Sequence, residues 1–247
     1  MKVVIFGGTT EGRELSRALA ALRINVTVCV ATDYGREEQG EAAGVTVLTG
    51  RRSEAEKLAL LRGAALCVDA THPYATGITE SVREACAKAN VPYRRLLRDA
   101  GETADAVTVA DAAEAAAYLQ GTEGNILLTT GAKELSAFAS LPRERLYARV
   151  LPSHEGIAAC EAAGIPHRNI AAMQGPFSEE LNAALLRQYR IAWLVTKDGG
   201  KAGGFPEKAR AASSCGARLI VLQRPEEVGE SMQEIVESIK EMRKQCE

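Results

Sequence analysis

The 247-residue chain lacks several features that would assign a protein to a class at once. It has no apolar run near the roughly 20 residues that a membrane-spanning helix requires. A strand-like pattern begins at Val3, with no charged region and apolar block before it. The formal net charge is only -2, so there is no polybasic signature and nucleic acid is not an expected partner. We therefore expect a cytoplasmic protein that binds neither membrane nor nucleic acid.

Cysteine motifs are also missing. The six cysteines are scattered, none forms a C-x-x-C pair, and none lies near a histidine at metal-ligand spacing. Cys29 and Cys67 lie inside apolar runs, where free cysteine is commonly a small core residue. The sequence therefore predicts a reduced chain with no metal site. Its 46% hydrophobic and 25% charged residues are enough for an ordinary globular core.

Short β-rich runs alternate with longer amphipathic stretches along the chain. The expected strands are the eleven runs VVIF, VTVCV, VTVL, LCVDA, YRRLL, AVTVA, NILLTT, LYARVL, NIAAM, AWLVT and RLIVL. Most are continuously apolar, as expected of strands covered on both faces. Leu15 and Leu19 share one face of the first helical stretch, and Ile235 and Ile239 share one face of the last. This alternation predicts parallel sheets with right-handed crossovers.

The number of strands also bears on how the chain divides into domains. Eleven strands are many for one open sheet in a chain of this length. The polar stretch from Arg98 to Ala106 separates two series of strands and helices. We therefore expect an α/β fold of two Rossmann-like or flavodoxin-like lobes, with parallel sheets and a cleft between them. Residues 1–99 would form a dinucleotide-binding lobe, and residues 100–247 a lobe that contributes to the substrate and cofactor cleft.

The stretch VVIFGGTTEG joins the first strand to a helix through bare backbone. A helix N-terminus carries unpaired N–H groups and a partial positive charge, and glycine lets a phosphate approach them. The spacing Gly7-x-Thr9-x-x-Gly12 resembles the dinucleotide fingerprint with threonine in the middle position. Its hydroxyl could bind a phosphate oxygen or cap the helix; the alternative is a tight turn with no ligand. The candidate cofactor-binding residues are Gly7, Gly8, Thr9, Thr10, Glu11, Gly12 and Arg13.

The end of the second strand bears on the choice of nicotinamide. An acidic residue there would select NADH by holding the ribose hydroxyls. Asp33 lies close to that position, but Thr32 could occupy it instead. Arg13 could reach the 2′-phosphate of NADPH. The choice between NADH and NADPH stays open.

Further polar segments follow other strands, where ligands of open parallel sheets bind. VDATHPYA, LLTTGAKEL and LVTKDGGKAGG are three such loops, and PYRRLLR carries arginines that could bind carboxylates bidentately. A mobile surface loop, a structural histidine and solvated arginines are the alternatives. The candidate residues are His72, Tyr74, Arg94, Arg95, Arg98, Thr130, Gly131, Lys133, Lys197, Gly199, Gly200 and Lys201.

Taken together, these segments resemble the precorrin-6A reductase family of cobalamin biosynthesis, known as CobK in the aerobic pathway and CbiJ in the anaerobic one. The matching pieces run from Val3 to Ala212 in family order: VVIFGGTTEGRELSRAL, VDATHPYA, LLTTGAKEL, YARVLP, NIAAMQGPFSEELN and LVTKDGGKAGGFPEKARAA. The first of these alone is weakly specific. MQGPFS followed by TKDGG and GGFPEK is much more so.

The resemblance implies a reduced nicotinamide cofactor, NADH or NADPH, and a tetrapyrrole substrate. The reaction would be hydride transfer to one double bond of precorrin-6A or its cobalt form, giving precorrin-6B. Thr130 and Gly131 would contact the cofactor together with the opening loop. The substrate carries many carboxylates, so basic side chains would line its site, as would His72, Gly199 and Gly200. The basic candidates are Arg94, Arg95, Arg98, Lys133, Arg149, Lys197 and Lys201.

A proton must also reach the reduced bond, and His72, Tyr74 and Lys197 can each donate one. The sequence does not choose among them. Two other functions stay open: another nicotinamide-dependent reductase, and a non-enzymatic NAD(P)-binding redox sensor. The chain has no Y-x-x-x-K pair, which is common in nicotinamide-dependent epimerases. A sensor would not need anion-binding loops in a second lobe. The metal state of the substrate and the oligomeric state are not determined.

Overall fold

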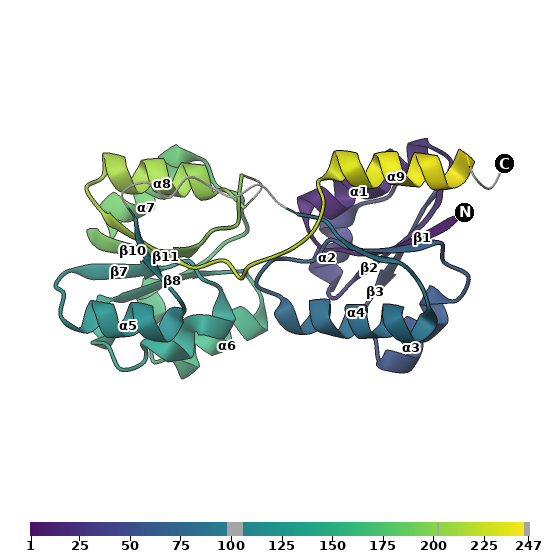
Figure 1. The fold of residues 1–247 in the computed structure, drawn as a ribbon. Helices are drawn as coiled ribbons and strands as arrows, with labels where there is room; N and C mark the ends of the chain where they lie inside the picture. Colours follow the sequence, from purple (N-terminus) through teal and green to yellow (C-terminus); the bar gives the residue numbers. More distant parts are fainter. Residues whose placement is uncertain (98–105, 202, 245–247) are drawn as a thin grey trace. The chain divides into compact units, whose positions relative to one another are not determined.

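The computed structural model describes residues 1–97, 106–201 and 203–244, and the chain divides into two compact units (Figure 1). The first unit contains Met1–Arg98 and Pro225–Glu247, and the second contains Asp99–Arg224. Each unit has one all-parallel sheet with helices on both faces. The expected α/β fold and all eleven strand runs are confirmed. The expected cleft stays a prediction.

The described residues lack two features that would indicate a membrane protein or a metalloprotein. They include no helix that is long and apolar enough to cross a membrane. They also include no group of three or more histidine, cysteine or acidic side chains that could hold a metal ion. Cys29 and Cys67 are buried, as predicted for core residues.

The first unit has a five-stranded sheet in the order β3-β2-β1-β4-β5. Its strands are β1 (Lys2–Phe6), β2 (Asn25–Val30), β3 (Val45–Thr49), β4 (Leu66–Asp69) and β5 (Tyr93–Arg95). Its helices are α1 (Thr10–Ala21), α2 (Asp33–Gln39), α3 (Glu54–Leu61), α4 (Thr76–Ala89) and α9 (Met232–Lys244). From β1 the chain builds the sheet in one direction through β2 and β3, and then returns to the other side of β1 with β4. The strand order therefore reverses between β1 and β4.

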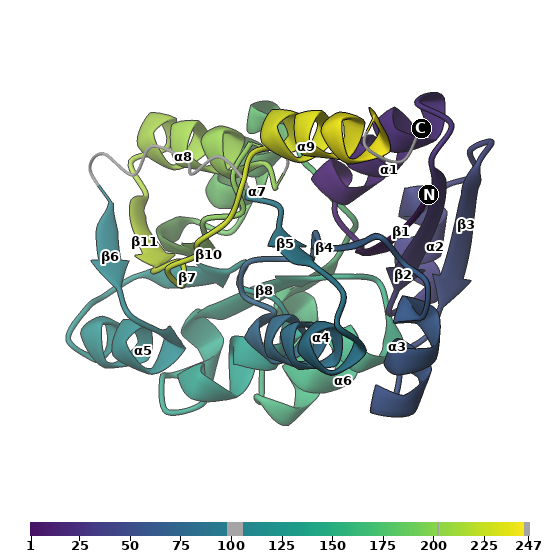
Figure 2. The same ribbon diagram turned by 45° about the vertical axis from the view of Figure 1, so that its right-hand side comes forward.

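Helices cover both faces of the first sheet. Helices α1 and α9 lie side by side on one face, and α3 and α4 lie on the other (Figures 1 and 2). Leu15 and Leu19 of α1, with Ile235 and Ile239 of α9, are fully buried against the strands. Burying a leucine or isoleucine side chain contributes about 1.5–3 kcal/mol. The two isoleucines therefore contribute to holding α9 on this unit.

The observed division differs from the expected boundary for the last segment of the chain. The sequence placed residues 100–247 in one lobe, whereas Pro225–Glu247 belong to the first unit. The physical reason is the apolar face of α9, which packs against α1 rather than against the second sheet. A backbone hydrogen bond also attaches the segment before α9 to the first unit, since the Leu97 N–H donates to the Glu230 carbonyl at 2.9 Å. The linker in which the boundary was expected lies outside the described residues.

The second unit has a six-stranded sheet in the order β6-β11-β10-β7-β8-β9. Its strands are β6 (Val107–Val109), β7 (Asn125–Leu128), β8 (Leu146–Val150), β9 (Ile170–Ala172), β10 (Ile191–Lys197) and β11 (Arg218–Leu222). Its helices are α5 (Ala112–Gln120), α6 (His154–Ala162), α7 (Glu179–Gln188) and α8 (Phe205–Ser214), with short 3-10 helices η1 (Ala132–Phe138), η2 (Arg143–Arg145) and η3 (His167–Asn169). Helices α7 and α8 cover one face, and α5 and α6 lie on the other (Figure 1). Here the strand order reverses between β7 and β10.

Candidate functional site

Each unit brings two strand ends together where its strand order reverses. In the first unit β1 pairs with β4, with Phe6 opposite Asp69. In the second unit β7 pairs with β10, with Leu128 opposite Val195. Ligands of open parallel sheets bind in the crevice beyond the carboxyl ends of such neighbouring strands. Four of the polar segments singled out in the sequence follow these four strands.

The loop from β1 to α1 uses its glycines in two different ways. Gly8 has a φ of +106°, and a Cβ there would have no heavy atom within 4 Å, so its backbone borders open space. A Cβ at Gly12 would lie 3.0 Å from the Ala70 Cβ and 3.3 Å from the Thr9 Oγ1. Only glycine lets α1 pack this closely against the end of β4. Close ligand approach and close helix packing are both functions of the dinucleotide fingerprint glycines.

Thr9 is the N-cap of α1. Its Oγ1 accepts a hydrogen bond from the Gly12 N–H at 3.1 Å and donates one to the Ala70 carbonyl at 2.8 Å. The hydroxyl therefore caps the helix, one of its two expected roles, and ties the loop after β1 to the loop after β4. Thr10 begins α1, and Glu11 lies in its first turn. A carboxylate there interacts favourably with the helix dipole but would oppose a phosphate nearby.

The residues expected to determine the choice between NADH and NADPH contact α2 or lie at its start. The Arg13 guanidinium donates to the Glu38 carbonyl at 2.9 Å, so it is engaged with the last turn of that helix. Thr32 is the N-cap of α2 and accepts from the Gly35 N–H at 3.0 Å, and Asp33 is the first helical residue. Neither arrangement selects NADH or NADPH.

The end of β4 carries a buried polar network. Asp69 is fully buried, and its carboxylate accepts hydrogen bonds from the Thr71 N–H at 3.0 Å, the Thr71 hydroxyl at 2.7 Å and the Tyr93 hydroxyl at 3.0 Å. The Arg95 Nη1 lies 2.7 Å from Asp69 Oδ1, and the Arg95 Nε donates to Glu227 at 2.7 Å. Burial, followed by the adjacent Asp69 carboxylate, raises the pKa of the Tyr93 hydroxyl, which therefore stays a donor.

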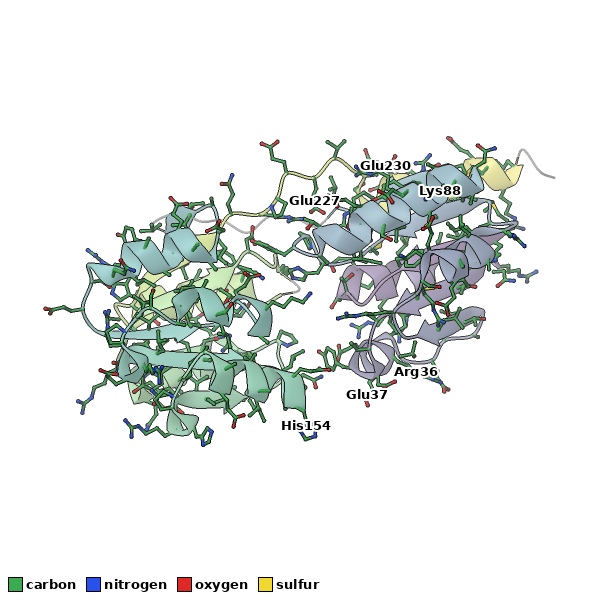
Figure 3. All side chains as sticks on the ribbon, turned by 90° about the horizontal axis from the view of Figure 1, so that it is seen from below. Arg36, Glu37, Lys88, His154, Glu227 and Glu230 are labelled. Carbon is green, nitrogen blue, oxygen red and sulfur yellow. The ribbon has the colours of Figure 1, made fainter. Side chains whose placement is uncertain are left out.

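Arg94 and Arg95, which the sequence proposed as substrate ligands, both have carboxylate partners within the first unit. Arg95 is buried between Asp69 and Glu227, and Arg94 pairs with Glu230. Glu227 and Glu230 lie on the segment that leads into α9 (Figure 3). We therefore assign Arg95 a structural role. Arg98 lies outside the described residues.

His72 and Tyr74 follow β4, beside the loop that ends β1. The His72 Nδ1 accepts a long hydrogen bond from the Tyr74 N–H at 3.4 Å, and the two ring centroids are 5.6 Å apart. Both side chains are partly exposed, whereas Pro73 between them is buried and fixes the loop. The two side chains therefore lie at an edge where a ligand could reach them.

In the second unit, the loop after β7 contains an unusual hydroxyl. Thr130 Oγ1 is buried and has no hydrogen-bond partner among the described residues. Gly131 has a φ of +90°, and a Cβ there would have no heavy atom within 4 Å. Lys133 is exposed on η1, and the Lys197 Nζ at the end of β10 donates to Glu134 at 2.8 Å. A buried hydroxyl without a partner beside open backbone favours a ligand at this position.

The glycines of the loop after β10 have structural explanations. A Cβ at Gly203 would lie 2.7 Å from the Gly199 carbonyl oxygen, so a larger residue at position 203 would clash with the backbone of Gly199. Gly200 and Gly204 have φ values of +64° and +66°, and the Gly200 N–H donates to Asp198 at 2.9 Å. The glycines thus shape a tight turn. The predicted ligand contacts of Gly199 and Gly200 stay predictions.

One lysine of this region was missed by the sequence interpretation. Lys201 is exposed on the loop, but Lys208, the fourth residue of α8, extends back beneath it. The Lys208 Nζ lies 3.4 Å from the Thr196 Oγ1 and 3.3 Å from the Gly203 carbonyl oxygen. The sequence GGFPEK could have indicated this position of Lys208, because a lysine in the first turn of a helix points back towards the preceding loop.

The comparisons with known proteins all point in one direction. The sequence model of the family described as "Precorrin-6x reductase CbiJ/CobK" matches residues 2–247. A cobalt-precorrin-6A reductase of Methanothermobacter thermautotrophicus is 36% identical over 92% of this chain and 77% of that protein. One of Priestia megaterium is 34% identical over 90% of each chain. A precorrin-6A reductase of Mycobacterium tuberculosis is 32% identical over 91% of this chain and 89% of its own. The solved structure titled CobK precorrin-6A reductase, 24% identical, matches the fold with a TM-score of 0.79 over 98% of this chain and 97% of that one.

Proposed function

This chain belongs to the precorrin-6x reductase CbiJ/CobK family, and from that membership we propose that it reduces one double bond of the precorrin-6A macrocycle in cobalamin biosynthesis. The observation that carries the proposal is the family match across residues 2–247, together with 36% identity to a cobalt-precorrin-6A reductase. The product is precorrin-6B or its cobalt form.

The cobalt form is the substrate that we propose first. The relatives at 36% and 34% identity are both named cobalt-precorrin-6A reductases. The relative named without cobalt is 32% identical, so the metal-free substrate is the second choice. These values are close, and the order decides only which substrate is tested first.

The cofactor is a reduced nicotinamide, which supplies a hydride when bound. We assign its pyrophosphate to the loop between β1 and α1. The open backbone at Gly8 and the N-terminus of a 12-residue helix support this assignment, because unpaired N–H groups at such a terminus favour phosphate. Gly7 turns the strand into the loop, and Thr9 fixes the loop to β4. Thr130 and Gly131 stay proposed cofactor contacts.

The substrate is a polycarboxylate, so basic side chains must compensate its charge. We propose Lys133, Lys197 and Lys201 of the second unit and His72 of the first as its contacts. Lys133 and Lys201 are exposed, and Lys197 is held by Glu134 in one orientation. A charge-assisted hydrogen bond to each carboxylate contributes about 1.5–3 kcal/mol.

Reduction of a double bond also needs a proton. His72 and Tyr74 are our candidates for its delivery, because both follow β4 beside the proposed pyrophosphate loop. Lys197 is a third candidate, although its ammonium is already paired with Glu134. A donor must come within hydrogen-bond reach of the reduced carbon, and solvent can serve in its place.

Anaerobic turnover tests this function directly. Cobalt-precorrin-6A and metal-free precorrin-6A are each incubated with NADH and with NADPH, while the spectra of the nicotinamide and of the macrocycle are followed. We expect matched loss of reduced nicotinamide and macrocycle in at least one combination. Binding of dinucleotide without any consumption would favour a redox sensor. Consumption only with an unrelated acceptor would favour another reductase.

A further inference from the structure

Arg149 is a buried cation with no charged partner among the residues that the structure describes. It lies near the end of β8 and is only 7% exposed. Its Nη1 donates to the Asn182 Oδ1 at 2.7 Å, and the guanidinium carbon lies 4.2 Å from the centroid of the Phe177 ring. The described residues provide no protein partner for its Nε and Nη2. An amide and an aromatic face thus hold the guanidinium in place and leave donors unused.

Lys208 is a second cation of the same kind. Its Nζ reaches only two neutral oxygens, the Thr196 hydroxyl at 3.4 Å and the Gly203 carbonyl at 3.3 Å, and both distances are long for a hydrogen bond. Within the described part of the chain, neither Lys208 nor Arg149 has a carboxylate oxygen within 4.0 Å. Arg95 at the end of β5 and Lys197 at the end of β10, by contrast, each contact a carboxylate.

The charge of Arg149 also acts on Lys208. Burial lowers the pKa of Arg149 to about 10. Burial, and then the charge of Arg149, lower the pKa of Lys208 to about 8, whereas Asp198 and Glu207 act in the opposite direction. Two neighbouring cations removed from water are unfavourable unless an anion compensates them. Lys208 keeps part of its surface exposed, so an anion from solvent can reach it.

Arg149 and Lys208 lie where the two most specific sequence segments meet. A Cβ at Gly204 would lie 3.5 Å from the Pro176 Cβ, so the segments MQGPFS and KDGGKAGGFPEK adjoin. Arg149 covers the Phe177 ring of the first segment, and Lys208 belongs to the second. Arg149 is the penultimate residue of β8, and the Lys208 Nζ lies 3.4 Å from Thr196 Oγ1 near the end of β10. Both cations are therefore at the carboxyl edge of the sheet, which is the ligand edge of such folds. Packing of the loops alone does not require charge at either position.

We propose that Arg149 and Lys208 form a binding recess for one oxyanion, either a carboxylate of the macrocycle or a phosphate of the dinucleotide. This inference rests on the proposed function. The free Nε and Nη2 of Arg149 offer a fork that matches two oxygens of a carboxylate or phosphate, and Lys208 adds a point charge. Asn182 and Phe177 position the fork before the anion arrives.

The test compares Lys208→Met and Arg149→Lys with wild type and with Arg168→Met. The control removes one positive charge from an exposed position of the same unit. Substrate and cofactor are varied separately in anaerobic steady-state assays. We expect Lys208→Met to raise one KM at least tenfold, Arg149→Lys to raise the same KM, and the control to leave both within twofold. A raised KM for the tetrapyrrole identifies a carboxylate, and a raised KM for the dinucleotide identifies a phosphate.

Wild type is assayed first, so that failure of the proposed function can be distinguished from failure of the proposed oxyanion recess. No turnover by wild type contradicts the proposed function. Normal wild-type turnover with both KM values unchanged in both variants overturns the recess. Thermal unfolding without ligand adds a second criterion: Lys208→Met should keep or raise the melting temperature, because it removes a partly buried cation that lies beside the charge of Arg149. A lower melting temperature with unchanged KM would make Lys208 a structural residue and overturn the inference.

Discussion

Substituting Arg95 by methionine is the sharpest test of how the first unit is held together. Arg95 joins the end of β5 to Asp69 at the end of β4 and to Glu227 in the segment before α9. Methionine keeps much of the side-chain volume but removes the guanidinium. Asp69, which is fully buried, would then keep only its hydrogen bonds from Thr71 and Tyr93. Glu227 would lose its contact with the Arg95 guanidinium as well.

The size of the effect follows from burial. Removing one partner of a buried ion pair costs about 3–5 kcal/mol, because the other charge stays buried without compensation. A whole domain is stable by only about 5–15 kcal/mol. Arg94→Met is the matched control, since Arg94 and Glu230 have side chains that are 29% and 35% exposed. Exposed pairs of this kind contribute about 1 kcal/mol or less. Two adjacent arginines should therefore differ by several kcal/mol.

Urea denaturation measures this difference. Far-UV circular dichroism follows both units, whereas the single tryptophan, Trp193, lies in the second unit and reports on it alone. Arg95→Met should move the dichroism transition to lower urea, with a smaller shift in fluorescence. A loss below about 1 kcal/mol, or a loss equal to that of Arg94→Met, would refute the structural role. Unchanged stability together with a raised KM for the substrate would instead indicate that Arg95 binds the substrate.

Other substitutions test the loops. Gly8→Ala should weaken binding of reduced dinucleotide more than tenfold, or by about 1.4 kcal/mol, in a fluorescence titration; Gly50→Ala, which shares a φ of +106° and open surroundings, is the control and should bind normally. The pKa of Lys208 is lowered from 10.5 to about 8, so the unfolded chain binds more protons between these values and stability should rise with pH across them. Denaturation of Lys208→Met should lack that rise. Lys201→Ala should raise the KM for the tetrapyrrole tenfold to a hundredfold and spare the dinucleotide, as steady-state kinetics will show. Equal changes for both ligands would contradict its assignment.

The strands could be predicted because each is a short, continuously apolar run. Strands covered on both faces by helices must be apolar throughout, and this holds for runs such as Val3–Phe6 and Leu219–Leu222. The helix after the opening glycines could also be predicted, and α1 begins at Thr10, whereas the packing of Gly12 against Ala70 was not foreseen. These features depend on local sequence.

The features that could not be predicted depend on which segments meet in space. The apolar face of α9 showed that the helix packs, but not that it packs on α1. Arg95 and Glu227 are 132 positions apart, so the sequence could not show that the arginine was already paired. The close contact between Gly199 and Gly203, which shapes the loop after β10, is not visible in sequence either, and the anion-binding role of this loop stays a prediction. Tertiary contacts decided each of these cases.

Transfer of deuterium from the cofactor to the macrocycle tests the central claim most directly. Cobalt-precorrin-6A is reduced anaerobically with nicotinamide that carries deuterium at the transferring C4 position, and the product is analysed by mass spectrometry. The account predicts one deuterium per product molecule, retained at the reduced carbon. A reduced product without label would show that the hydride does not come from the nicotinamide and would contradict the account.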